Sequence, residues 1–236
     1  IMEGALWKSD VANCLYKILE EEFRHAGKKS WLHSLCLIGT FKRDDDSYIP
    51  TLDSRARGLK PFPPDEAFSG FIIVIEDTFI MCTESSGDGM IKWLEKLYLD
   101  QEAEKVDVKI LFMRHNLPHR QLYGWSTAYY SAVRSATSEV VENESPLDCI
   151  VRQILMILIY CINSPALKSL AEALNELPYI FPSLVPSYYT LKEVITSGYG
   201  TDLTHFVRNF IHENEETPFD SETVIPVPKL PDIQFD

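Results

Sequence analysis

Short apolar runs separated by polar turns recur in the first half of the chain, and this pattern predicts β-strands. The first run is apolar on both faces and ends at Gly39, so we expect a central strand that is buried on both sides. Glu76-Asp77 separates two later runs and predicts the turn of a β-hairpin. The predicted strands cover residues 32–39, 70–75, 78–84, 107–113 and 122–133.

Apolar residues at a spacing of three to four predict helices between and after these strands. One helix begins at Ser9 and ends at Gly27, and a second follows Asp88 as its N-cap. The second helix carries four apolar residues on one face, which we expect to pack on the sheet: Ile91, Leu94, Leu97 and Tyr98.

Further helix starts lie in the second half of the chain. Ser145-Pro146 and Ser164-Pro165 each combine an N-cap serine with proline at the first helical position. The helix after Ser145 is apolar almost all round over residues 149–159, so we expect it to be buried on several sides. Ser187 and Thr201 start two more helices.

Residues 40–68 interrupt both patterns. They contain Pro50, Pro61, Pro63 and Pro64 and show no apolar period of 3.6 residues. We therefore expect a long loop between the first two strands.

The order of the elements predicts an α+β fold, in which a mixed sheet with helices is followed by a helical extension and a proline-rich tail. The expected divisions are an N-terminal helical segment, the sheet domain, the helical extension and the extended tail. They cover residues 1–30, 31–135, 136–214 and 215–236.

Charge and composition limit the partners. The chain has 236 residues, 45% of them hydrophobic, and a net charge of −13, so it can bury a core but repels phosphates and anionic lipid. We expect basic or apolar protein partners, no nucleic acid and no membrane, and leave direct contact with tubulin open.

Five scattered cysteines without a Cys-x-x-Cys pair indicate buried thiols in a reducing compartment. With no leader and no apolar run near the roughly 20 residues of a membrane span, we expect a cytoplasmic protein.

Candidate catalytic and metal-binding residues do not form a set. His115 and His119 are four apart, but Pro118 between them excludes the helix that a zinc pair at this spacing needs. Asp44-Asp45-Asp46 lacks the glycine and distal glutamate of a calcium loop. Glu84 has no second carboxylate or histidine fixed beside it, so we expect it to accept hydrogen bonds from backbone N–H groups. The sequence predicts no metal site and no enzyme.

The hairpin and a later aromatic motif carry a resemblance to a known domain. Residues 69–84 read Ser-Gly, an apolar strand, a turn and Phe-Ile-Met before Glu84, and Tyr123-Gly124-Trp125 follows. This layout resembles the BLUF domain, a flavin-binding blue-light sensor, whose hairpin has Thr-Gly and Phe-Phe-Gln at these places and whose last strand opens Phe-x-x-Trp. The resemblance implies a BLUF-like, ferredoxin-like sheet.

The positions that hold flavin in that family differ here. The family uses a tyrosine on the first strand, an asparagine before Thr-Gly and the glutamine of the second hairpin strand. The corresponding residues are Leu37, Pro63 and Met81, none of which can make those hydrogen bonds. The family also has a helix where residues 40–68 predict a loop, so one wall of the flavin slot is expected to be missing. The resemblance therefore implies no bound flavin, and we expect no cofactor.

The layout of nearly the whole chain, with its helical extension and closing residues 221–228, resembles the testis-expressed protein 47 family. These are proteins of motile cilia and sperm flagella with a BLUF-like domain that lacks the flavin residues. The resemblance implies a non-catalytic structural or adaptor protein of the cytoskeletal axoneme, bound to axonemal accessory proteins in a large assembly. The alternatives are a flavin- or nucleotide-binding sensor with altered anchoring residues and an enzyme of unrecognised type.

The tail predicts an interaction segment. It contains Pro218, Pro226, Pro228 and Pro231, so it favours an extended, polyproline-like conformation. Its apolar residues are too numerous for a solvated end, and the candidate contacts are Phe219, Val224, Ile225, Val227 and Leu230. We expect the tail to lie in a groove of a partner, with the protein's own domain as the alternative.

Overall fold

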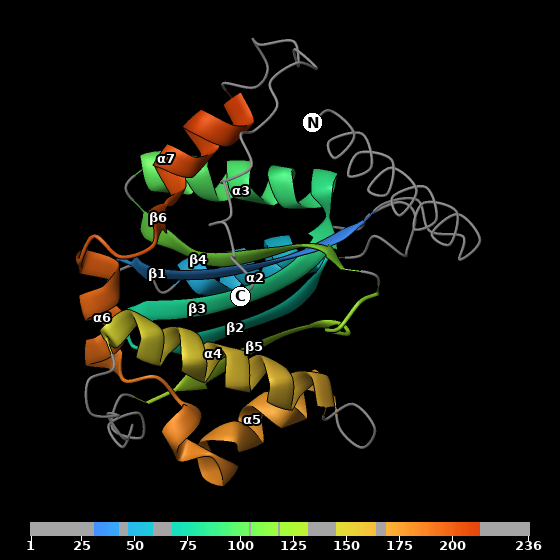
Figure 1. The fold of residues 1–236 in the computed structure, drawn as a ribbon, viewed down its shortest axis with the longest axis vertical. Helices are drawn as coiled ribbons and strands as arrows, with labels where there is room; N and C mark the ends of the chain where they lie inside the picture. Colours follow the sequence, from blue (N-terminus) through green and yellow to red (C-terminus); the bar gives the residue numbers. More distant parts are fainter. Residues whose placement is uncertain are drawn as a thin grey trace, which may run out of the picture.

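One six-stranded sheet organises the described part of the chain (Figure 1). The computed structural model describes residues 31–42, 47–58, 68–103, 105–117, 119–131, 145–163 and 169–212. The strands lie in the order β5-β2-β3-β1-β4-β6. Their bounds are β1 (Leu32–Phe41), β2 (Ser69–Ile75), β3 (Thr78–Ser86), β4 (Val106–Leu117), β5 (Trp125–Tyr130) and β6 (Thr201–Asp202).

Helices cover both faces of this sheet, so the molecule has three layers (Figure 1). One face packs against α2 (Tyr48–Gly58), α3 (Gly87–Glu102) and α7 (Leu203–Val207). The other packs against α4 (Pro146–Asn163), α5 (Leu170–Ile180) and α6 (Tyr188–Thr196). A short 3-10 helix, η3 (Pro182–Leu184), and a short π-helix, η4 (Arg208–His212), complete the described elements.

The topology confirms the α+β, ferredoxin-like prediction. The elements β1-α2-β2-β3-α3-β4 form a split βαβ arrangement in which β1 lies between β3 and β4 and is antiparallel to both. β5 adds to the edge parallel to β2, and β6 pairs with β4 at the opposite edge. The division at residues 135–136 stays a prediction, although the extension contributes β6 to the sheet.

The prediction of a long loop over residues 40–68 is wrong, because α2 occupies Tyr48–Gly58. β1 and β2 run in the same direction with β3 between them, so their connection must cross one face of the sheet. Tyr48, Ile49, Leu52 and Ala56 form the buried side of this helix. Pro50 falls in the first turn, where a missing N–H costs no intrahelical hydrogen bond.

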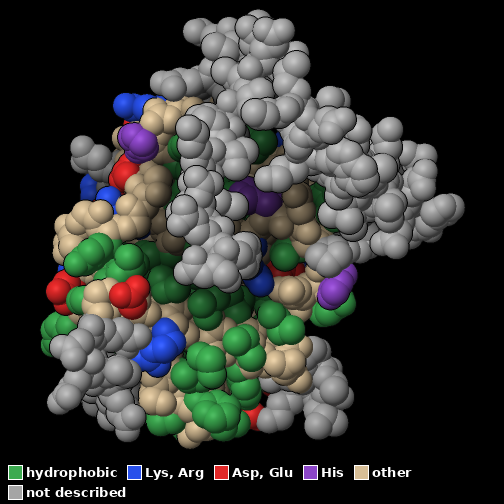
Figure 2. Space-filling view, viewed as in Figure 1, with side chains coloured by type: hydrophobic (Ala, Val, Ile, Leu, Met, Phe, Trp, Pro, Cys, Tyr) green, Lys and Arg blue, Asp and Glu red, His purple; other side chains and the backbone are tan. Residues whose placement is uncertain are grey.

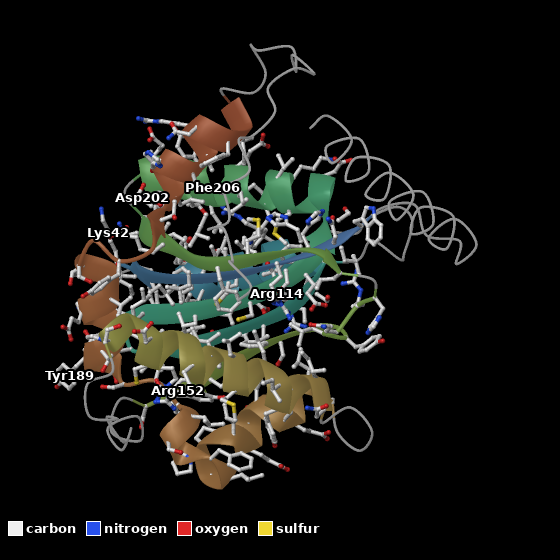
Figure 3. The ribbon with its side chains drawn as sticks, viewed as in Figure 1. Lys42, Arg114, Arg152, Tyr189, Asp202 and Phe206 are labelled. Atoms are coloured by element: carbon white, nitrogen blue, oxygen red, sulfur yellow. The ribbon has the colours of Figure 1, made fainter. Side chains whose placement is uncertain are left out.

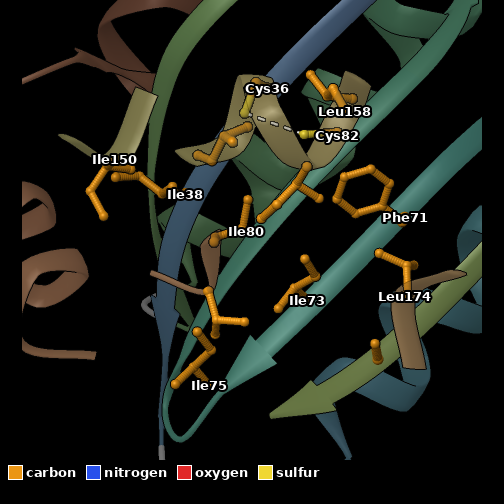
Figure 4. Close-up of a cluster of buried hydrophobic side chains, with 14 of the residues drawn as sticks. Cys36, Ile38, Phe71, Ile73, Ile75, Ile80, Cys82, Ile150, Leu158 and Leu174 are labelled. Carbon is orange, nitrogen blue, oxygen red and sulfur yellow. Dashed lines mark hydrogen bonds between the residues drawn. The ribbon is translucent and has the colours of Figure 1, made fainter. Parts of the chain in front are cut away.

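The sheet separates two apolar cores, because successive side chains of a strand point to opposite faces. Leu35 and Leu37 of β1 point toward α2 and α3, whereas Cys36 and Ile38 point toward α4 and α6. Figure 4 shows the second core, where Cys36 and Cys82 lie opposite each other with their Sγ atoms 3.4 Å apart. The predicted burial of the cysteines is confirmed for the four described ones, Cys36, Cys82, Cys149 and Cys161.

Several predicted element starts shift in the structure. Ser86, and not Asp88, caps α3 by accepting a hydrogen bond from the Gly89 N–H. Asp202, and not Thr201, caps α7, while the last predicted strand begins at Trp125 and not at Leu122. The two helices begin at a neighbouring polar residue, and the strand begins after a longer loop. The sequence pattern locates such boundaries only to within a few residues.

The helix after Ser145 forms as predicted, but it is not buried on several sides. The inner face of α4 contributes Ile150, Ile154, Ile157 and Leu158 to the core. Its outer face exposes apolar side chains, because no described element covers that side. Three predicted features lie outside the described residues: the helix of residues 9–27, the helix start at Ser164-Pro165 and the tail. The first described helix after α4 is α5, which is capped by Ser169.

Candidate functional site

The space between α2, α3 and the sheet is where the flavin slot of the resembled domain is expected. Leu37 of β1 and Met81 of β3 are direct cross-strand partners on the face of the sheet toward these helices. Both side chains are fully buried in the apolar core. Two of the three predicted anchor positions therefore meet in one place, and the third, Pro63, lies outside the described residues.

An aromatic group packs at the β5 end of this space. The Phe68 ring lies between two tryptophans, with its centroid 4.8 Å from that of Trp93 and 5.3 Å from that of Trp125. Trp93 is fully buried, and the two indole rings meet edge to face at 6.4 Å. The sequence motif Tyr123-Gly124-Trp125 did not identify these neighbours, because Phe68 and Trp93 lie far from it in the chain.

Asp53 of α2 connects this helix to β5 through polar contacts. One of its carboxylate oxygens accepts hydrogen bonds from the Trp125 Nε1–H, at 2.9 Å, and from the Thr127 hydroxyl. The other accepts from Arg57 at 2.8 Å. Burial acts to raise the pKa of Asp53, but the hydrogen bonds from Arg57, Thr127 and Trp125 outweigh it and hold the pKa below its ordinary value. Asp53 thus stays charged and fixes α2 against the sheet edge.

A second polar cluster surrounds Glu84 at the end of β3. Glu84 is fully buried, and its Oε2 accepts the backbone N–H groups of Gln121 and Leu122 at 2.8 and 2.9 Å. Arg114 of β4, labelled in Figure 3, lies 3.9 Å from the Oε1 atom. The expected backbone donors are therefore present, although they belong to the segment before β5 and not to a helix. This arrangement holds a loop in place.

The structure describes two of the residues considered as metal ligands, His115 and His119. His115 lies on β4, as expected away from any helix, and its Nδ1 is 3.0 Å from the Nδ1 of His33 on β1. Burial, together with the neighbouring His115, lowers the pKa of His33. Asp44-Asp45-Asp46 lies outside the described residues. Within the described ranges, no group of three or more histidine, cysteine or acidic side chains is placed to hold a metal ion.

On the other side of the sheet, the outer face of α4 exposes apolar side chains. Leu155, Met156 and Ile159 follow one another at helical spacing, with Ile159 50% exposed, and Arg152 lies one turn before them. We call these four residues the α4 face. Figure 2 shows a broad hydrophobic area over α4 and α5, and Figure 3 places Arg152 on the same side. By length and composition alone α4 could cross a membrane, a test that core helices also pass, and its inner side packs on the sheet.

Comparison with known proteins gives one family and one group of solved structures. The family model of testis-expressed protein 47 matches residues 31–211. Among solved structures, the BLUF protein BlrB in its dark state is 13% identical over 44% of this chain and 75% of its own, with a TM-score of 0.35. BlsA in its photo-activated state is 18% identical over 62% of this chain and 94% of its own, also with a TM-score of 0.35.

The longer solved proteins are matched only in part. A bacterial light-regulated adenylyl cyclase is 12% identical over 53% of this chain, with a TM-score of 0.35, and the match covers 34% of the cyclase. No curated protein matches the chain.

Proposed function

Since the chain belongs to the testis-expressed protein 47 family, we propose that it is a non-catalytic structural adaptor of the motile cilium or sperm flagellum, built on a BLUF-like sheet that no longer binds flavin. The observation that carries this proposal is the apolar packing of Leu37 and Met81. Both side chains lie fully buried where the resembled domain has hydrogen-bonding groups. Because neither side chain can donate or accept a strong hydrogen bond, these two positions offer nothing to orient an isoalloxazine ring.

The α4 face supports the adaptor part of the proposal. Three exposed apolar residues at helical spacing suit helix-on-helix docking. The apolar tail residues, from Phe219 to Leu230, remain a predicted second contact. The partners are then axonemal accessory proteins of a large assembly.

Detergent extraction of flagella or cilia that contain the tagged chain tests this proposal. We expect the wild-type chain to stay with the axoneme and the Ile159→Glu variant to be extracted, because a buried charge would oppose docking of the α4 face. Leu99→Glu is the matched control, since Leu99 is also exposed on a helix but lies on α3, away from this face. A wild-type chain found wholly in the soluble fraction would contradict the proposal, as would equal retention of the two variants.

One observation favours the second candidate, a flavin- or nucleotide-binding sensor with altered anchors. Sequence reasoning expected one wall of the slot to be missing, but α2 supplies a helix at that place. The visible absorption spectrum of the purified protein separates the two candidates. Flavin bands at about one flavin per chain would overturn the adaptor proposal in favour of the sensor.

A further inference from the structure

A pocket of about 500 Å³ lies where the end of β5 meets α5. Two tyrosines beside it are largely exposed, and a third is fixed because the Tyr130 hydroxyl donates to the Leu174 carbonyl at 2.7 Å. We call it the tyrosine pocket, and its lining residues are Tyr129, Tyr130, Ser131, Asn175, Pro178 and Tyr179.

The lining selects for a neutral ligand with flat apolar surfaces and exposed acceptors. None of the six side chains carries a formal charge at neutral pH, so phosphate groups and other ions find no counter-charge among them. The tyrosine rings offer faces for stacking, while the Asn175 amide and the Ser131 hydroxyl offer hydrogen-bond donors.

An extended proline-rich peptide meets these requirements. In the polyproline II conformation the backbone makes no internal hydrogen bonds, so its carbonyl groups are free to accept from a protein surface. Aromatic-lined grooves bind such segments at low entropic cost, because the conformation is already formed before binding. Three residues per turn place the two prolines of a Pro-x-x-Pro sequence on the same edge.

We propose that the tyrosine pocket is a binding site for a proline-rich peptide and that its occupant is Pro228-Lys229-Leu230-Pro231 of the same chain. These four residues form a Pro-x-x-Pro sequence in the tail, outside the described residues. Pro228 and Pro231 stack on the tyrosine rings, while the carbonyl groups between them accept hydrogen bonds from the lining. Lys229 and the acidic residues of the tail stay in solvent, which agrees with the uncharged lining.

The length of the intervening chain allows this contact. The 16 steps from His212 to Pro228 span up to about 55 Å when extended, whereas a folded domain of this size is about 40 Å across. The tether makes the contact intramolecular, so the tail competes for the tyrosine pocket with any free peptide. A partner that captures the tail must then displace it from the tyrosine pocket, a consequence that does not depend on the proposed ciliary role.

Photo-crosslinking in the full-length chain tests the proposal. A benzophenone amino acid in place of Leu230 should react with the segments 129–131 or 175–179, and the product should migrate as a monomer. Tyr179→Ala should lower the yield of this product about tenfold, and the combined Pro228→Ala and Pro231→Ala substitutions should do the same.

Matched controls separate the pocket from unspecific contact. Tyr189 on α6 is 78% exposed against 70% for Tyr179, and Figure 3 shows it at the outer side of its helix, so Tyr189→Ala should leave the yield unchanged. Pro218→Ala controls for the loss of a tail proline outside the Pro-x-x-Pro sequence. A pocket product that migrates as a dimer would overturn the proposal in favour of a second copy's tail. Products at other sites, or a yield that Tyr179→Ala does not change, would overturn the site itself.

Discussion

At the scale of single residues, Asp53 decides how α2 is held against the sheet. Its carboxylate accepts from Trp125, Thr127 and Arg57, so one side chain joins two elements that no backbone hydrogen bond connects. We expect Asp53→Ala to lower the free energy of unfolding by about 2 kcal/mol, because the indole N–H and the hydroxyl lose their acceptor. Arg57→Ala, which removes only an exposed ion pair, should cost below about 0.5 kcal/mol in the same denaturation experiment. Equal losses would show that the contact to β5 is unimportant.

The same carboxylate gives this stabilisation a pH dependence. The folded-state pKa of Asp53 lies below its ordinary value of 3.8, so the charged form is the one that the fold stabilises. The contribution is fully present above pH 3.8 and is lost as the pH falls through the lower, folded-state pKa. The difference in unfolding free energy between wild type and Asp53→Ala should therefore be constant near neutrality and shrink in acid. A difference that grows on acidification would contradict this sign.

Met81 tests whether one anchor can restore the ancestral site. We expect Met81→Gln to bind no flavin and to lower the unfolding free energy by roughly 1–3 kcal/mol, because the new amide is buried without assured partners. Absorption spectra and thermal melting measure the two effects. Met81→Leu, which keeps the site apolar, should cost below about 1.5 kcal/mol. A yellow Met81→Gln protein would show that the slot still accepts the ring.

At the scale of elements, α4 separates an inner from an outer apolar face. Ile157 is fully buried and Ile159 is half exposed, although they are two residues apart and chemically identical. Ile157→Ala should cost about 2–5 kcal/mol, whereas Ile159→Ala should stay within about 0.5 kcal/mol of wild type. Urea denaturation measures both. Large losses for both residues would mean that a cover on the outer face is part of the folded monomer.

The strands could be predicted from the sequence because their signals are local. The hairpin turn at Glu76-Asp77 and the central strand β1 follow from alternation and from continuous apolar runs. The helix α2 could not be predicted in the same way, since four prolines hid the spacing of Tyr48, Ile49 and Leu52. A crossing connection is required because β1 and β2 run in the same direction with β3 between them, and this strand order is known only from the structure.

The candidate site was predictable only in part, for a related reason. Leu37 and Met81 could be placed because both lie on well-defined strands that pair directly. Asp53 and Phe68 could not, because they belong to the segment expected as a loop and their partners on α3 and β5 are more than twenty residues away. Contacts of this kind depend on how elements pack and leave no periodic signal in the sequence.

At the scale of the whole molecule, the helical extension completes the fold. The sheet face toward α4 and α6 is made of Cys36, Ile38, Phe71, Ile73 and Ile80 among other apolar residues. A fragment of residues 31–135 would expose this face to water, so we expect it to aggregate or to lack a cooperative thermal transition. The fragment 31–212 should melt cooperatively as a monomer. A monomeric, cooperatively folded 31–135 fragment would show that the predicted domain division is also a folding boundary.

The buried pair Cys36 and Cys82 allows opening of the core to be followed by thiol labelling. Burial first, and then the hydrogen bond and charge of Cys36, raise the pKa of Cys82, so the native thiol is protonated and unreactive. Cys82 lies in the core beneath α4 and α6, so an alkylating reagent can modify it only when these helices move away from the sheet. In excess reagent, the rate of labelling at Cys82 therefore measures how often the core between the sheet and these helices opens. The same measurement in living cells would report whether assembly into a larger structure slows this opening.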